Sequence, residues 1–143
     1  MTTPAVLQKR YGYPTLDSKD VASGNGMSVA EFQRQYYDDK DLSQFQEQCA
    51  VSNPVTVDET IGGNKESVCS STPMGCVEAL LDIEYIDAVA SPIPLQVIYS
   101  GTFSLLDWVN GVLDSDSPSL VQSVSYGNDE VQQTSSEYMN FSR

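Results

Sequence analysis

Residues 77–100 read VEALLDIEYIDAVASPIPLQVIYS, and this segment contains one helix and one strand. Apolar side chains recur at helical spacing in its first part, which predicts an amphipathic helix over 77–90. The residues of this apolar stripe are Val77, Leu80, Leu81, Ile83, Ile86, Val89 and Ala90. The following run, with Leu95, Val97 and Ile98, predicts a buried strand over 94–100. A helix that leads directly into a buried strand is a unit from which α/β proteins are built.

The segments on either side extend the same alternation. Residues 55–57 favour a short strand, 103–113 a helix and 118–126 a further strand. The order from the first of these strands is strand, helix, strand, helix, strand, which predicts an α/β fold with a parallel sheet. We expect a surface loop over 64–75 and a polar final segment over 128–143 that begins a helix.

The first fifty residues favour three short helices. Thr3 can cap a helix that ends at Gly12. Ser28 and Glu31 have the spacing of a capping box, so a second helix is expected to start there. A third helix is expected to begin at Asp41.

The charge of the chain limits its partners. The 143 residues fit one domain and include 7 Lys or Arg against 20 Asp or Glu, which gives a net charge of −13. Such a field repels phosphate backbones and anionic membrane surfaces, so we expect neither nucleic acid nor a membrane as partner. No apolar run approaches the roughly 20 residues that span a bilayer, and the first residues do not read as a signal peptide.

The chain contains no histidine. Ser-His-Asp and Cys-His mechanisms are therefore excluded within it, as are histidine-based metal sites. Acid–base chemistry must use carboxylates, Tyr, Lys or Cys. The three cysteines, Cys49, Cys69 and Cys76, form no CxxC pair, and we expect them to be small buried residues. Their odd number leaves at least one free or paired outside the chain, and the pairing stays open.

One pair of carboxylates stands out on the helix predicted over 77–90. Glu78 and Asp82 are separated by one helical turn, so their side chains share a face and can meet. A buried pair of this kind shares a proton and can act as a general base at acidic pH. The alternative is chance, because the chain is rich in acids and Glu84 and Asp87 lie on the same helix.

The residues around this pair resemble the sedolisin family of serine-carboxyl peptidases. The run from Glu78 to Ile86 is similar to the segment that carries the family's acidic dyad. Further similar segments lie in family order at 3–11, at 20–45 and at 123–130, where the chain reads SVSYGNDE. The resemblance extends over nearly the whole chain.

This resemblance implies a fold and an activity. The fold would be a partial subtilisin-like α/β fold, with residues 1–143 as the N-terminal portion of the peptidase domain. Its parallel sheet would be flanked by helices and truncated before the half that bears the nucleophile. The activity would be proteolysis at acidic pH, by a tripeptidyl-peptidase or an endopeptidase with a Ser-Glu-Asp triad.

The resemblance also assigns roles to individual residues. Glu78 would be the general base that takes the proton of the serine hydroxyl, and Asp82 would hold Glu78 through a hydrogen bond. The backbone of Ser125, Tyr126 and Gly127 would pair with an extended peptide or protein substrate.

Some parts of the family pattern are missing from this sequence. The Gly-Thr-Ser motif of the nucleophile and the Ser-Gly-Asp-Ser-Gly run of the oxyanion aspartate are absent. A base without a nucleophile or an oxyanion donor cannot carry out acyl transfer, so we expect the chain alone to be inactive.

No cofactor is expected in this chain, although the complete family domain binds calcium. Asp114 and Asp116 do not form an EF-hand loop, because Ser119 and Ser125 stand where glycine and glutamate would be required. We therefore expect no metal site here.

The resemblance implies a lysosomal, vacuolar or secreted protein, and the glycosylation sequon at Asn140 to Ser142 favours the same interpretation. An alternative function stays open. A catalytically inactive, truncated peptidase fold could bind peptides on Ser125 to Gly127, or bind a separate chain that carries the missing C-terminal half of the domain.

Overall fold

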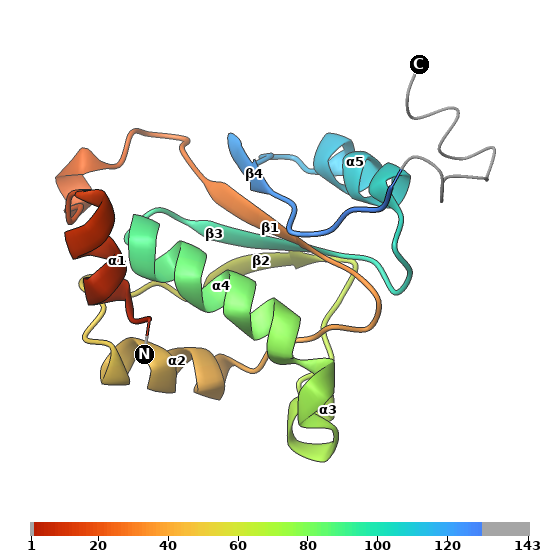
Figure 1. Ribbon diagram of the computed structural model, residues 1–143. Coiled ribbons are helices and arrows are strands. Elements are labelled where there is room, and N and C mark those ends of the chain that lie inside the picture. The colour runs from red at the N-terminus through yellow and green to blue at the C-terminus, as the bar shows by residue number, and fades with distance from the viewer. Residues whose placement is uncertain (1, 130–143) are drawn as a thin grey trace.

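Four parallel strands form the centre of the computed structural model, which describes residues 2–129 (Figure 1). The strands are β1 (Met27–Glu31), β2 (Val57–Ile61), β3 (Leu95–Tyr99) and β4 (Val121–Ser123), in the order β2-β3-β1-β4. Every neighbouring pair is parallel. The predicted α/β class with a parallel sheet is confirmed, and the arrangement is consistent with a partial subtilisin-like domain.

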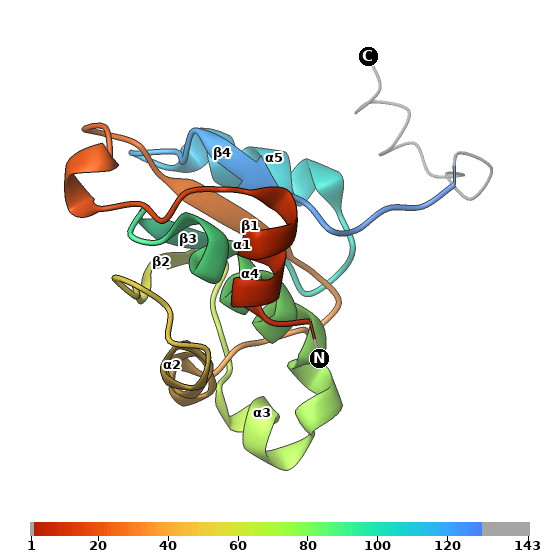
Figure 2. The ribbon, with the colours of Figure 1, turned by 60° about the vertical axis from the view of Figure 1, so that its left-hand side comes forward.

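Helices cover both faces of this sheet (Figures 1 and 2). One face carries α4 (Val77–Ala90), with α1 (Pro4–Tyr11) and α2 (Asp39–Gln48) packed beside it. The opposite face carries α5 (Leu105–Asp114), which contacts β3. The short helix α3 (Ser67–Ser71) precedes α4. Two short 3₁₀ helices, η1 (Ser18–Asp20) and η2 (Pro73–Gly75), lie among the described residues.

The core lies between the sheet and α4. Alternate side chains of β1 and β3 point toward this helix and are almost completely buried. The cluster comprises Met27, Val29, Leu95 and Val97 from the sheet with Ala79 and Ile83 from α4, joined by Tyr37 and Leu42. The other face is occupied by residues such as Ile98, against which Gly111 of α5 packs closely.

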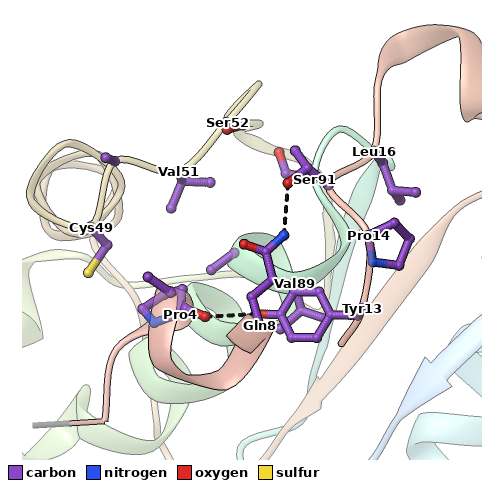
Figure 3. Close-up of a pocket in the computed structure, with 14 residues that line it drawn as sticks. Pro4, Gln8, Tyr13, Pro14, Leu16, Cys49, Val51, Ser52, Val89 and Ser91 are labelled. Atoms are coloured by element: carbon purple, nitrogen blue, oxygen red, sulfur yellow. Dashed lines mark hydrogen bonds between the residues drawn. The ribbon is translucent and has the colours of Figure 1, made fainter. Parts of the chain in front are cut away.

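The N-terminal segment is fixed against α4 (Figure 3). The Tyr13 hydroxyl donates a hydrogen bond to the carbonyl of Pro4 at 3.0 Å, and the Gln8 amide donates to Thr15 at 2.8 Å. The Tyr85 hydroxyl of α4 donates to the carbonyl of Thr2 at 2.7 Å. The pocket enclosed there measures only about 80 Å³, so it is a packing gap between elements and too small for a peptide.

Several predicted elements are confirmed. Helix α4 spans the predicted residues, and α1 is capped by Thr3, whose side chain accepts a hydrogen bond from Val6, and ends at Gly12 with φ +71°. The strand predicted over 94–100 is β3, and the helix predicted over 103–113 is α5. The helix expected from Asp41 is α2, which begins two residues earlier because Asp38 caps it.

The helix expected from Ser28 and Glu31 is wrong. These residues lie in β1, and all five residues of this strand are buried. The capping-box spacing of Ser28 and Glu31 arises from a strand whose two polar side chains find partners elsewhere in the fold. The Ser28 hydroxyl donates a hydrogen bond to the side chain of Gln122 in β4. Tertiary pairing therefore overrides the local signal.

The expectation for the segment over 64–75 also requires correction. It contains α3 and η2 rather than a continuous loop. A disulfide joins Cys69 to Cys76 across this segment, whereas Cys49 is free. Cys69 and Cys76 are buried as expected, and the odd cysteine is Cys49, which is only partly buried; the pairing, which the sequence left open, is thereby assigned.

Two edge strands differ in their bounds from the expected ones. β2 begins at the end of the segment 55–57 and continues to Ile61, and β4 covers only three residues of 118–126. The helix expected within 128–143 and the sequon at Asn140 lie outside the described part of the chain, apart from residues 128–129, which adopt no helix. Within residues 2–129, no helix is long and apolar enough to cross a membrane.

Candidate active site

The candidate site lies at the edge of the sheet where the parallel strands end. Ligands of open α/β sheets bind at this edge. The first turn of α4 places Glu78 there, and the chain that leaves β4 places Ser125, Tyr126 and Gly127 beside it. These four residues line one open pocket of about 460 Å³ with Gln33 and Gln35. The structure thus brings together the residues predicted for proton transfer and for substrate binding.

Glu78 is held through the backbone of its own helical turn. Its backbone N–H donates a hydrogen bond to the side-chain oxygen of Gln35 at 3.1 Å. The Gln35 amide nitrogen donates in turn to the carbonyl of Met74 at 3.1 Å. The N-cap residue Cys76 makes no capping hydrogen bond with its side chain. Gln35 therefore performs the capping function from outside the helix.

Asp82 lies one turn further along α4 and is half-buried. Burial raises the pKa of its carboxyl group, a hydrogen bond from Ser125 opposes this shift, and the negative charge of Glu78 adds to it. Its Oδ2 atom is buried without a hydrogen-bond partner. Within residues 2–129 no hydrogen bond joins the carboxyl groups of Glu78 and Asp82, so they interact here through charge.

A third carboxyl group, Glu31, completes the cluster and was missed by the sequence analysis. It is the last residue of β1, is 1% exposed, and accepts a hydrogen bond from the Tyr126 hydroxyl at 3.1 Å. Burial raises the pKa of Glu31 to about 8, the charge of Asp82 adds to this shift, and the hydrogen bond from Tyr126 opposes it. An acidic residue directly after the mostly apolar stretch that contains Met27, Val29 and Ala30 was the available signal.

Aromatic side chains fix the position of Tyr126. Its ring meets Phe32 edge-on with centroids 4.9 Å apart, and Phe32 meets Phe103 at 5.3 Å in the same manner. Burial and the charge of Glu31 raise the pKa of Tyr126, so its hydroxyl stays protonated and donates to Glu31. The predicted substrate-binding segment is thereby anchored directly to the acidic cluster.

This arrangement suits proton transfer at acidic pH. Three carboxyl groups lie near one another in partly dry surroundings, and two of them have raised pKa values. Such a cluster retains protons that isolated carboxylates would lose, and it can accept and return one proton without histidine. Within residues 2–129, no group of three or more His, Cys, Asp or Glu side chains could hold a metal ion.

Comparison with known proteins identifies relatives of this chain. No protein-family model matches it. Tripeptidyl-peptidase 1 from Homo sapiens is 31% identical over 138 residues, which cover 90% of this chain and 23% of the human protein. The resemblance to the sedolisin family is confirmed. Tripeptidyl-peptidase 1 from Dictyostelium discoideum is 29% identical over 133 residues, and that from Mus musculus is 29% identical over 154 residues.

The match is extensive in this chain and partial in its relatives. The aligned region covers 90% of this chain for the Dictyostelium protein and 96% for the mouse protein. The chain spans only about a fifth to a quarter of these tripeptidyl-peptidases, at 21% and 26% of their lengths. The relatives are peptidases by name, and this supports a peptidase family for the chain.

Proposed function

We propose that this chain supplies the acid–base part of a serine-carboxyl peptidase that hydrolyses peptide bonds at acidic pH. The complete enzyme would be a tripeptidyl-peptidase or an endopeptidase. One observation carries this proposal: Glu78 lines the same pocket as Ser125, Tyr126 and Gly127, with Asp82 one turn behind it. The similarity to tripeptidyl-peptidase 1 supports the same class of reaction.

In this proposal Glu78 is the general base. Its carboxylate takes the proton from a serine hydroxyl as the oxygen attacks the peptide carbonyl, and returns the proton to the leaving amine. Burial raises the pKa of Asp82, and in the complete enzyme its protonated carboxyl group would donate a hydrogen bond to Glu78 and hold that side chain toward the serine hydroxyl. The serine and the oxyanion donor come from residues outside this sequence, so the chain alone is inactive.

The substrate would bind along the segment after β4. Ser125 and Gly127 are exposed, and residues 124–127 belong to no strand within the described chain. Their backbone N–H and C=O groups can therefore pair with an extended peptide, as in other cases of strand addition. Tyr126 would stay fixed meanwhile, because its hydroxyl donates to Glu31.

The proposed location is lysosomal, vacuolar or extracellular. The disulfide between Cys69 and Cys76 supports an oxidising route of maturation. Buried carboxyl groups with raised pKa values support an acidic working pH, because protonation relieves both their desolvation and their mutual repulsion.

The decisive experiment measures peptide hydrolysis by the complete enzyme at about pH 4. The Glu78→Gln variant should lose at least about a hundredfold in kcat, because the base is removed while the shape is retained. Asp82→Asn should cost less and change the pH profile. Glu84→Gln, on the same helix but outside the pocket, is the matched control and should remain active. Substantial activity of Glu78→Gln would contradict the proposal.

A second function is favoured by the edge of the sheet at β4. The fold could bind peptides, or a partner chain that carries the rest of the domain, without catalysis. Among the described strands, β4 is an edge with one neighbour and could accept a further strand. Peptide binding without turnover by the protein in its natural form would support this alternative.

A further inference from the structure

A second pocket lies at the same edge of the sheet, beyond the ends of β2 and β3. Its volume is about 470 Å³, and its wall includes Arg34, Lys65, Tyr36 and Tyr99, with glycines at the ends of the strands. No acidic side chain from the described residues, 2–129, lines it. Nothing in the proposed proton transfer uses these residues.

The charge of this pocket is opposite to that of the chain. The sequence has 20 acidic and 7 basic residues, and two of the seven line this one cavity. Within residues 2–129, neither Arg34 nor Lys65 makes an ion pair; the salt bridge found there joins Lys19 to Asp17. Arg34 lies close enough to Tyr99 to work against the raised pKa of its phenol. The two cations are therefore available to an anion.

The walls of the pocket are fixed by contacts behind them. The Tyr99 hydroxyl donates a hydrogen bond to that of Tyr36 at 2.8 Å, and Tyr36 packs against the Cys69–Cys76 disulfide. The Asn64 side chain accepts from the backbone N–H of Tyr37 at 3.2 Å and donates to its carbonyl at 2.9 Å. A site held this firmly loses little entropy when a ligand binds.

One short segment separates this pocket from the candidate active site. Gln33 and Gln35 line the pocket of Glu78, whereas Arg34 and Tyr36 line the basic pocket. Gln33 and Arg34 have positive φ angles of 57° and 64°. Such strained backbone persists where the surroundings impose it, commonly at functional sites. A ligand that crosses this segment could occupy both pockets.

We propose that the basic pocket binds a carboxylate of the peptide whose backbone lies in the pocket of Glu78. This inference rests on the proposed function, because the carboxylate belongs to the substrate. Arg34 offers a planar fork of donors that matches a carboxylate, and Lys65 adds a point charge. The carboxylate is either an acidic side chain or the C-terminal group, and both present the same chemistry to the pocket.

The test is a set of binding titrations with three fluorescent peptides of equal length. One peptide is neutral, with Gln and an amidated C-terminus; the second has Glu in place of Gln; the third has a free C-terminus. The protein is the complete enzyme with Glu78→Gln, so that the peptides survive. At about pH 5 and low salt, one of the anionic peptides should bind roughly fivefold more tightly than the neutral one. The tighter peptide identifies the source of the carboxylate.

Paired variants show whether the pocket is responsible. The double variant Arg34→Gln with Lys65→Gln should bind all three peptides equally. The matched control removes one Arg and one Lys elsewhere: Lys9→Gln with Arg10→Gln, both exposed on α1, should keep the preference. Thermal unfolding confirms that both double variants are folded.

The possible failures are distinguishable. Equal binding of neutral and anionic peptides by the parent protein, or equal loss of preference in both double variants, would overturn the basic pocket and leave the proposed function intact. A protein that binds none of the three peptides would contradict the proposed function and this inference together.

Discussion

The side chain of Gln35 accepts a hydrogen bond from the backbone N–H of Glu78 at 3.1 Å and donates one to the carbonyl of Met74 at 3.1 Å. It thereby ties the start of α4 to the turn before it. The variant Gln35→Leu of the complete enzyme should lower kcat about tenfold to a hundredfold. The backbone N–H of Glu78 loses its acceptor in this variant, so the first turn of α4 shifts and Glu78 moves out of position. Hydrogen exchange at the Glu78 amide should accelerate in the same variant, and this readout does not depend on activity. Gln44→Leu, exposed on α2, is the control.

The conservative variant Gln35→Glu separates positioning from general packing. A protonated Glu can accept from Glu78 and donate to Met74, whereas an ionised Glu loses its donor and repels Glu78. Activity should therefore approach that of the wild type at low pH and fall earlier as pH rises. An unchanged pH profile, with only a lower activity throughout, would argue that Gln35 serves packing alone.

Because the carboxyl group of Glu31 is buried, we expect the fold to be more stable at acidic pH than at neutral pH. Its pKa is raised to about 8 from an ordinary value of 4.5, so the folded state holds a proton that the unfolded state releases. The contribution is fully present below about pH 4.5 and is lost as pH rises toward 8. The free energy of unfolding should fall by up to about 5 kcal/mol across this range.

Urea unfolding of the wild type, of Glu31→Gln and of Glu47→Gln at several pH values checks this prediction. Glu31→Gln should remove much of the pH dependence, whereas Glu47→Gln, exposed on α2, should leave it unchanged. Part of the slope should remain, since burial also raises the pKa of Glu84 to about 7 and raises the pKa values of Asp82 and Asp87. Equal slopes in all three proteins would contradict the burial of an ionisable Glu31.

Local sequence patterns predicted α4 well because its apolar spacing is set within fourteen residues. The same kind of reasoning failed at β1, where Ser28 and Glu31 imitate a helix cap. Their partners, Gln122 and Tyr126, lie more than ninety residues away in sequence. A strand that carries polar groups inward is recognisable only when those distant partners are known. Because β1 was not predicted as a strand, Glu31 at its end was not recognised as part of the site.

In the candidate site too, residues on one local element were predictable, whereas those that depend on tertiary contacts were not. Glu78 and Asp82 could be proposed from helical spacing and family resemblance, because both lie on one predictable helix. The contribution of Gln35 could not be predicted from the sequence, because it depends on how the chain turns after β1. The basic pocket depends on the ends of two strands and on a disulfide that the cysteine count left open.

The disulfide between Cys69 and Cys76 should contribute measurably to stability. It closes a loop with a sequence separation of 7. Closing such a loop limits the unfolded chain and corresponds to about 2.5 kcal/mol in the chain-entropy model. The variant Cys69→Ser with Cys76→Ser should therefore unfold at lower urea concentration, and reductant should destabilise the wild type but not this double variant. Cys49→Ser is the control because Cys49 is free; an equal loss there would contradict the assignment.

Gly62 and Gly63 form a matched pair at the end of β2. Both have positive φ angles, of 88° and 97°, so alanine at either position is strained. A Cβ at Gly62 would also lie 2.0 Å from the carbonyl oxygen of Tyr99, whereas one at Gly63 would meet nothing within 4 Å. Gly63→Ala should cost about 1–2 kcal/mol, and Gly62→Ala should cost about 2 kcal/mol more, because β2 and β3 must separate. Urea unfolding of both variants measures the difference, and equal losses would show that the ends of the two strands are not in close contact.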